Sequence, residues 1–305
     1  MPSGNRANQP QEGLMNENQL DRPVLIVGTP RSGKSLITNV FRSAPEFCLV
    51  NEPLSIWNLG MPNRSDDCRS AEEATAKIRE KILEACREQL MRSGKSRYLD
   101  NLAYHSLRIS FANAVLPNAK IIFVTRDGRA AIPEMVRGWT MKTSIVGTAR
   151  NTRRSINLRT LPRLALRFGV NYLSGILKGR RATWGPAVPG LREFSGNRAI
   201  AEVVAFQWGE LNRIALEGLR SIPKERWIQV RFEDLIDRPE EEFLKIARFA
   251  DVQSPDAVSQ YASVFVSPNN IPKQSQWTAA EVSADEWEKI DPLIASMQRA
   301  LGYSS

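Results

Sequence analysis

The chain has 305 residues, 42% hydrophobic and 25% charged, which is ordinary for a soluble globular protein of one or two domains. This composition excludes a low-complexity chain, while three cysteines without CxxC spacing and one histidine exclude a disulfide scaffold and sites with several Cys or His ligands. The net charge of +9 comes from residues 135–192, which contain twelve Lys or Arg and no Asp or Glu, so we expect an anionic partner. The chain has no apolar signal core and no run long enough to span a membrane, so a cytoplasmic protein is expected.

The predicted elements begin after a polar tail. Residues 1–20 are rich in Asn, Gln, Pro and Gly and predict disorder, so residues 21–305 are expected to form the domain. The apolar run Pro23–Val27 predicts a buried strand of a parallel sheet. A Gly/Pro/Ser loop follows, and Ser35–Phe41 has the pattern of a helix.

The next segments continue this alternation of strands and helices. Phe47–Val50 predicts a short strand, and Ser70–Glu73 predicts a capping box at the start of a helix that runs to about Met91. The apolar stripe of that helix makes Cys86 a core residue rather than a nucleophile; its members are Ile78, Ile82, Cys86 and Leu90.

The second half of the chain repeats the pattern. Ala119–Thr125 and Arg226–Phe232 predict strands. Asp237 is the expected N-cap of a helix that runs through Phe249, and Ala284–Leu301 predicts the last helix. We therefore predict an α/β fold, with a mostly parallel central sheet covered by helices on both faces.

One loop has the pattern of a phosphate-binding site. Gly28–Ser35 reads Gly-Thr-Pro-Arg-Ser-Gly-Lys-Ser and satisfies the P-loop pattern G-x-x-x-x-G-K-[S/T], between a predicted strand and a predicted helix. Backbone N–H groups of such a loop converge on an anion, and Lys34 adds a positive charge. The alternative is an ordinary Gly/Ser turn.

A second cationic position follows the strand that ends at Thr125. An ATP or GTP enzyme needs an acidic residue near this point to organise Mg²⁺, yet Arg126 comes first and Asp127 second. Arg126 at the carboxyl end of a parallel strand is placed to bind a second phosphate. The alternative is an ion pair between Arg126 and Asp127 in a surface turn.

Further segments, in order along the chain, resemble the sulfotransferase family, which uses 3′-phosphoadenosine 5′-phosphosulfate (PAPS). Pro30–Gly33 is similar to that family's 5′-phosphosulfate loop, and Ala119–Arg129 is similar to its 3′-phosphate strand and turn. Other similar segments are Asp100–His105, Trp184–Gly190, Arg231–Leu235, Arg238–Glu240, Ile246–Phe249, Trp277 and Leu301–Tyr303. The resemblance implies a P-loop kinase-like fold and transfer of a sulfuryl group from PAPS to a hydroxyl or amine, with no required metal.

The resemblance also implies roles for the loop residues. Arg31 stands where the family has a catalytic Lys or Arg that bridges the leaving oxygen and the sulfuryl group. Ser32, Gly33, Lys34 and Ser35 would line the 5′-phosphate, and Arg126 would bind the 3′-phosphate.

Two residues compete for the role of general base. Glu52 follows the second strand, as the catalytic glutamate does in several subgroups, although a Glu before Pro53 can also simply cap a loop. His105 is the second candidate, offset from the position of the family's histidine, where Ala103 stands.

Three positions depart from the family's pattern. Lys34 replaces the usual Thr or Ser, and Asn101 stands where Lys is common. Glu134 falls where a Ser contacts the 3′-phosphate, and its carboxylate would repel that phosphate unless it is turned away or paired. Arg129 and Lys273 are candidates to compensate.

Residues 140–183 fall where the family varies and where acceptor specificity usually lies. This segment mixes apolar and cationic residues, which suits an anionic membrane surface, an acidic glycan or a solvated lid. We expect a small-molecule, glycan or lipid acceptor, with peripheral membrane contact through this segment, and no nucleic acid partner. Charge reversal at Arg153 and Arg154 is expected to weaken acceptor use and to leave donor binding intact.

Two rival functions remain beside a PAPS-dependent sulfotransferase. A P-loop NTPase or kinase that uses ATP and Mg²⁺ is favoured by Lys34 and Ser35 and opposed by Arg126. A non-catalytic lipid- or glycan-binding protein with the same nucleotide-binding fold is the second alternative, because Asn101 and Glu134 depart from the family's pattern.

Overall fold

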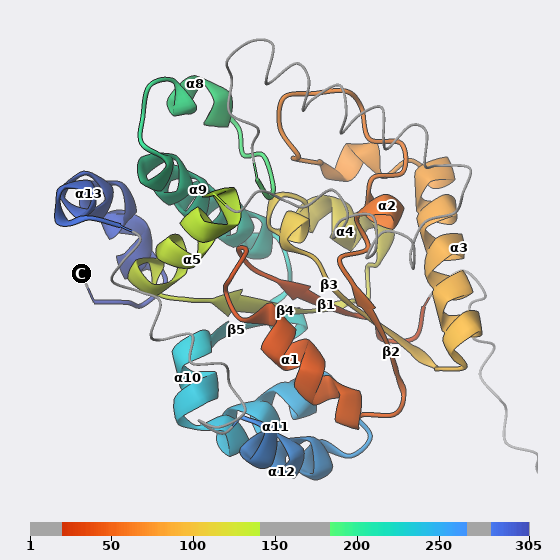
Figure 1. Cartoon of the computed structure of the whole chain (residues 1–305). Coiled ribbons are helices and arrows are strands. Elements are labelled where there is room, and N and C mark those ends of the chain that lie inside the picture. Colours follow the sequence, from red (N-terminus) through yellow and green to blue (C-terminus); the bar gives the residue numbers. More distant parts are fainter. Residues whose placement is uncertain (1–19, 141–183, 267–281, 305) are drawn as a thin grey trace, which may run out of the picture.

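The computed structural model of the chain describes residues 20–140, 184–266 and 282–304. At its centre is a five-stranded sheet in the order β2-β3-β1-β4-β5 (Figure 1). Every pairing is parallel, so the carboxyl ends of all five strands meet at one edge. The strands are β1 (Val24–Val27), β2 (Phe47–Asn51), β3 (Arg97–Asn101), β4 (Lys120–Thr125) and β5 (Trp227–Arg231).

Helices cover both faces of the sheet (Figure 1). One face carries α1 (Lys34–Val40), α10 (Phe232–Asp237), α11 (Pro239–Phe249) and α12 (Pro255–Phe265). The other carries α2 (Leu54–Trp57), α3 (Ala76–Ser93), α4 (Ile109–Val115), α5 (Gly128–Thr140), α8 (Leu191–Ser195), α9 (Ile200–Arg220) and α13 (Ala284–Ala300). The predicted α/β class, with a parallel sheet between two helical layers, is confirmed.

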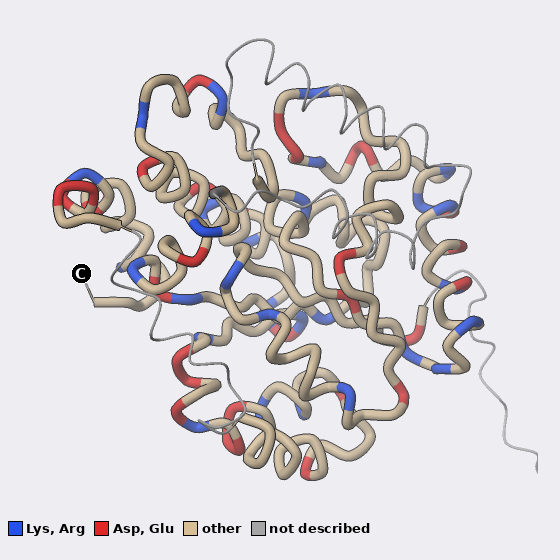
Figure 2. The backbone as a smooth tube through the Cα atoms, viewed as in Figure 1, with Lys and Arg blue, Asp and Glu red and all other residues tan. Residues whose placement is uncertain are grey.

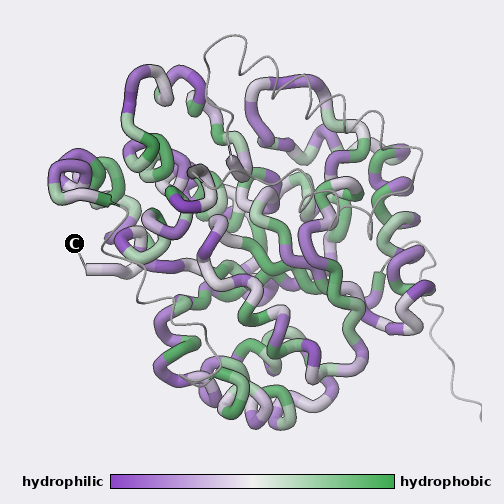
Figure 3. Tube along the Cα trace, in the orientation of Figure 1, coloured by the Kyte–Doolittle hydropathy of each residue, from purple (hydrophilic) through white to green (hydrophobic). Residues whose placement is uncertain are grey.

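The strands divide the core into two halves. In β1, Val24 and Ile26 pack with the α1, α11 and α12 side, whereas Leu25 and Val27 pack with the α3, α4 and α9 side. Because successive side chains of a strand point to opposite faces, a strand buried on both sides must be apolar throughout. Much of the centre of the molecule is accordingly hydrophobic (Figure 3).

Two predicted helix starts were wrong in detail. The capping box at Ser70 begins a short 3-10 helix, Ala71–Glu73, and α3 begins later, where the Thr75 side chain accepts from Ile78 N. Asp237 ends α10 instead of capping α11, whose N-cap is Arg238. The turn after β5 forms a helix of its own, which leaves Asp237 inside it.

The strand β3 was not predicted, since its sequence is polar at three of five positions. All five of its residues are nevertheless buried. Arg97 donates to three backbone carbonyls, Asp251 O at 2.7 Å, Ala250 O at 2.8 Å and Arg22 O at 2.8 Å. Partners from distant parts of the chain therefore allow polar residues in a central strand.

The charge distribution differs between the described elements and the basic segment. In the described elements Lys and Arg are interspersed with Asp and Glu, and acidic residues gather on α10 and the first turn of α11 (Figure 2). Most of the basic segment, including Arg153 and Arg154, lies outside the described residues, as do Trp277 and residues 1–19 of the tail predicted over residues 1–20. Within the described ranges, every helix is too short or too polar to traverse a lipid bilayer.

Candidate active site

The loop between β1 and α1 lies at the carboxyl edge of the sheet, and glycine is required at two of its positions. Gly33 has φ 95°, and a Cβ there would lie 2.1 Å from the ring of Phe232. A Cβ on Gly28 would lie 2.3 Å from Val124 O of the neighbouring strand. The loop is thus pressed between β4 and the start of α10, which holds its backbone in one conformation.

Arg31 lies at the exposed tip of the loop in a left-handed conformation, with φ 65°. This backbone conformation is unfavourable for a residue with a Cβ by about 1–2 kcal/mol. Two contacts stabilise it: its carbonyl accepts a 3.0 Å hydrogen bond from Arg126 Nη1, and its guanidinium lies 5.9 Å from the Trp184 ring. Strain of this kind is often found where backbone geometry serves a ligand.

Lys34 begins α1 and is buried, with 6% of its surface exposed. Its Nζ donates a 2.7 Å hydrogen bond to Thr29 O, so the side chain folds back beneath the loop. Burial lowers the pKa of Lys34 to about 8; the Glu52 carboxylate acts in the opposite direction, and Arg31 lowers it further. The departure from the family's Thr or Ser therefore adds a desolvated ammonium group to the loop.

The two serines of the loop have different surroundings. Ser32 is fully buried, and its Oγ has no hydrogen-bond partner in the described part of the chain. Ser35 is exposed on the first turn of α1. A buried hydroxyl without a partner is costly, so Ser32 Oγ is available to an anion or a water bound in the loop.

Arg126 follows β4 beside the loop. Its Nη2 lies 2.9 Å from Glu134 Oε1 on α5, and its guanidinium packs 4.6 Å from the centroid of the Phe232 ring. The alternative pairing with Asp127 was wrong, because the Asp127 carboxylate accepts from Arg129 N at 2.8 Å and from Gln298 Nε2 at 2.6 Å. Phe232 therefore contacts both predicted phosphate-binding elements, the loop at Gly33 and Arg126.

Glu52 follows β2 at the same edge of the sheet. Its backbone N donates to Asn101 O at 3.0 Å, and its φ of 51° is again left-handed. The side chain is exposed on one side, and the protein around its other sides removes water, which raises the pKa of its carboxyl; Lys34 and His105 lower it. A carboxyl with a raised pKa is suited to accept a proton.

His105 lies beneath this edge in the short helix Ala103–Leu107 and is fully buried. Its Nε2 is 2.9 Å from Asp100 Oδ1, and its Nδ1 has no partner among the described residues. Asp100 also accepts from Trp57 Nε1 at 2.6 Å and from Tyr98 OH at 3.1 Å. Of the two candidate bases, Glu52 is the one that reaches the surface.

The other predicted residues are placed as follows. Asn101 is buried at the end of β3 and donates to Thr38 Oγ1 at 3.3 Å. Arg129 points away from the loop and pairs with Asp291 of α13 at 2.6 Å. Lys273 lies outside the described residues.

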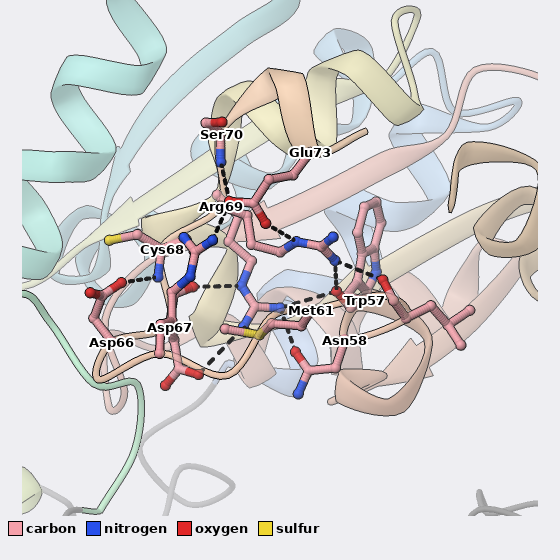
Figure 4. A network of polar contacts seen from close by, with 12 residues as sticks. Trp57, Asn58, Met61, Asp66, Asp67, Cys68, Arg69, Ser70 and Glu73 are labelled. Atoms are coloured by element: carbon pink, nitrogen blue, oxygen red, sulfur yellow. Dashed lines mark hydrogen bonds and ion pairs between the residues drawn. The ribbon is translucent and has the colours of Figure 1, made fainter. Parts of the chain in front are cut away.

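A network of two buried arginines holds α2, the helix that follows Glu52 (Figure 4). Arg69 donates to Trp57 O at 2.9 Å and to Leu59 O at 3.0 Å, and it pairs with Glu73 at 3.2 Å. Arg108 donates to Trp57 O at 3.3 Å and to Asn58 Oδ1 at 2.8 Å. The carbonyls at the end of α2 are thus satisfied by cations, which fixes the helix that starts next to Glu52.

The Trp184-Gly-Pro segment packs against the loop at Pro30 and Arg31. Gly185 lies close to Pro30, since a Cβ added to Gly185 would be 3.5 Å from Pro30 Cγ. Gln207 of α9 donates to Trp184 O at 3.0 Å and to Pro186 O at 2.7 Å. Sequence reasoning missed Gln207 because a single glutamine in a helix carries no distinctive pattern.

The structure therefore brings Arg31, Ser32, Gly33, Lys34, Ser35, Arg126 and Glu52 together at one edge of the sheet. It leaves His105 buried behind Asp100 and turns Arg129 toward α13. Phe232 was also missed as a site residue, although it lies in the Arg-Phe-Glu-Asp-Leu segment that carries part of the family resemblance.

Comparisons with known proteins identify similar chains. The model of the sulfotransferase family matches residues 23–167. The chain is 23% identical over 259 residues to a protein-tyrosine sulfotransferase of Drosophila melanogaster, an alignment that covers 82% of this chain and 42% of the relative. The chain thus spans about two fifths of the length of that curated relative.

A solved structure shows the same fold. The sulfotransferase domain from the curacin biosynthetic pathway has a TM-score of 0.51 to this chain at 14% identity, and the match covers 94% of this chain and 99% of that domain. The resemblance noted in the sequence is confirmed by these similarities, and the chain shares its fold with that solved domain.

Proposed function

Because residues 23–167 match the model of the sulfotransferase family, we propose that this protein transfers a sulfuryl group from PAPS to an acceptor hydroxyl or amine. The observation that carries the proposal is the joining of two cationic elements at one edge of the sheet. Arg126 from the end of β4 donates a 3.0 Å hydrogen bond to Arg31 O at the tip of the loop. A donor with phosphates at both its 5′ and 3′ positions requires two such neighbouring sites.

The donor site of this proposal is formed by the loop and the end of β4. Ser32 Oγ and the loop backbone, with Lys34 beneath them, line the 5′-phosphosulfate, and Arg126 faces the 3′-phosphate. Among the described residues, the buried atoms Ser32 Oγ and Arg126 Nε have no hydrogen-bond partner, so both can donate to an oxyanion.

Sulfuryl transfer needs positioning and positive charge, as phosphoryl transfer does. The bond from the acceptor oxygen to sulfur forms while the bond from sulfur to the 5′-phosphate oxygen breaks. Arg31 stabilises the charge on the leaving oxygen, and Glu52 accepts the acceptor's proton, for which its raised pKa suits it. The negative adenosine 3′,5′-bisphosphate leaves without a proton.

Glu52 is the proposed base, and His105 is the alternative. Single-turnover sulfation by the E52Q and H105A variants separates the two. We expect E52Q to lose the chemical step while H105A retains it. Loss in H105A with full activity in E52Q would reverse the assignment.

The acceptor is proposed by its reacting group. The relative in Drosophila melanogaster is named for a protein tyrosine, which offers a hydroxyl. We propose a hydroxyl or amine of a small molecule, glycan or lipid, and an anionic acceptor drawn to the basic segment. Charge reversal at Arg153 and Arg154 is expected to raise the KM for acceptor without changing donor binding.

Nucleotide-dependent thermal stabilisation tests the proposal against an ATP-dependent enzyme. A ligand that binds only the native state adds about 2.7 kcal/mol at about 100 times its Kd. We expect stabilisation by adenosine 3′,5′-bisphosphate without Mg²⁺. Stabilisation by ATP alone, and only with Mg²⁺, would instead assign a P-loop NTPase.

A further inference from the structure

The ion pair between Arg126 and Glu134 lies where the proposed donor carries its 3′-phosphate. Nη2 of Arg126 is 2.9 Å from Glu134 Oε1, and the two side chains are 6% and 11% exposed. Nη1 of the same guanidinium donates to Arg31 O at 3.0 Å. The charge of the guanidinium is therefore balanced by a carboxylate before any ligand binds, although Arg126 Nε has no hydrogen-bond partner among the described residues.

Next to Arg126 in the described part of the chain, the charged groups named here are paired or acidic. Arg129, the next cation along the chain, pairs with Asp291 at 2.6 Å. The depression beside Arg126 is lined on its other side by acidic residues of α10, Glu233 and Asp237. Glu233 accepts from Asp127 N at 3.0 Å and from Tyr303 OH at 2.9 Å, and these contacts hold it in place.

From this arrangement, and resting on the proposed function, we infer that Glu134 is a specificity-determining residue that reduces the selectivity of the donor site for a 3′-phosphate. An arginine binds a phosphate most strongly through two parallel N–H bonds. At Arg126 a phosphate must either displace Glu134 or bind next to its carboxylate. Each route reduces what the 3′-phosphate contributes to binding, so nucleotides that lack it compete better.

The experiment compares two nucleotides that differ by the 3′-phosphate. Dissociation constants of adenosine 3′,5′-bisphosphate and adenosine 5′-monophosphate are measured by isothermal titration calorimetry on the full chain. The proteins are the wild type, E134Q and the matched control E217Q, which removes one carboxylate from the exposed side of α9, where Glu217 pairs with Arg213 at 2.6 Å. E134Q removes the charge and keeps the shape of the side chain.

We expect the wild type to bind the bisphosphate less than about tenfold more tightly than the monophosphate, because a repelled charge offsets most of one ion pair. E134Q is expected to raise that ratio about tenfold or more through tighter binding of the bisphosphate, while monophosphate binding and the ratio in E217Q stay unchanged. The wild-type ratio alone tests the inference if E134Q does not fold.

If the wild type binds the bisphosphate far more than tenfold more tightly than the monophosphate, or if E134Q has the same ratio of dissociation constants as the wild type, Glu134 does not have this role. Either result leaves the proposed donor site unaffected. Absence of binding by both nucleotides to both the wild type and E134Q overturns the proposed donor site itself, and the role of Glu134 with it.

Discussion

Replacing Lys34 by Met tests the electrostatics of the loop, because this side chain is a buried ammonium group. Only 6% of Lys34 is exposed, and its Nζ is held by one hydrogen bond of 2.7 Å to Thr29 O. Methionine keeps the length of the side chain and removes the charge. We expect K34M to be more stable than the wild type at pH 7 and to bind the donor product more weakly.

The magnitude follows from the pKa. Burial lowers the pKa of Lys34 from 10.5 to about 8. At about 1.36 kcal/mol per pH unit this corresponds to a destabilisation of the native state of about 3 kcal/mol at neutral pH. The lost hydrogen bond to Thr29 O offsets about 1 kcal/mol. A net gain in unfolding free energy of about 2 kcal/mol is expected for K34M.

The gain must depend on pH in one direction. Below about pH 8 Lys34 is charged in both the native and the unfolded chain, so the difference in unfolding free energy between K34M and the wild type is constant. Between about pH 8 and 10.5 the unfolded chain binds more protons at Lys34 than the native chain does, so the wild type gains stability as pH rises. The advantage of K34M should therefore shrink through this window.

Urea unfolding of the wild type and K34M from pH 7 to 10 measures the effect. The control is K245M, which removes the charge of a 54% exposed lysine that pairs with Glu242. A stability difference between the wild type and K34M that does not change with pH, or that matches the K245M difference, would refute the reasoning.

Three further predictions follow from the site. G33A is expected to lower the free energy of unfolding by about 2 kcal/mol or more, because Gly33 has a positive φ and a Cβ there would clash with Phe232. G94A is the control for the cost of the backbone conformation alone, since Gly94 has φ 64° and nothing lies within 4 Å of its added Cβ. Urea unfolding compares the two variants. D100A is expected to lower the unfolding free energy by about 3–5 kcal/mol, because it leaves buried donors without their acceptor; equal stability in urea would contradict this. Glu52 acts as a base only when ionised, so the rate of sulfation should fall with decreasing pH above the usual range of a glutamate, because its pKa is raised; a pH–rate profile that is flat down to pH 5 would contradict its role.

Local patterns were sufficient for the elements that depend on neighbouring residues. The apolar run at Val24–Val27 and the glycines on either side of Arg31 predicted a strand, a loop and a helix in that order, and these elements are present. The alternation of such units predicted a parallel sheet, since parallel strands need crossovers that helices supply. In contrast, β3 was not predicted because it contains polar residues such as Arg97, whose hydrogen-bond partners are distant in sequence.

For the candidate site, the sequence by itself determined which residues lie at the carboxyl ends of the strands. It placed Arg31 and Lys34 after β1, Glu52 after β2 and Arg126 after β4. These positions follow from strand order along the chain, and in a parallel sheet they share one edge.

Only the tertiary structure decided how those residues are partnered. It paired Arg126 with Glu134, turned Lys34 beneath the loop and placed His105 in a buried contact with Asp100. Pairing, burial and pKa depend on distances between elements that are not neighbours in sequence. The charge that a ligand would meet at this edge of the sheet is therefore a property of the packed domain.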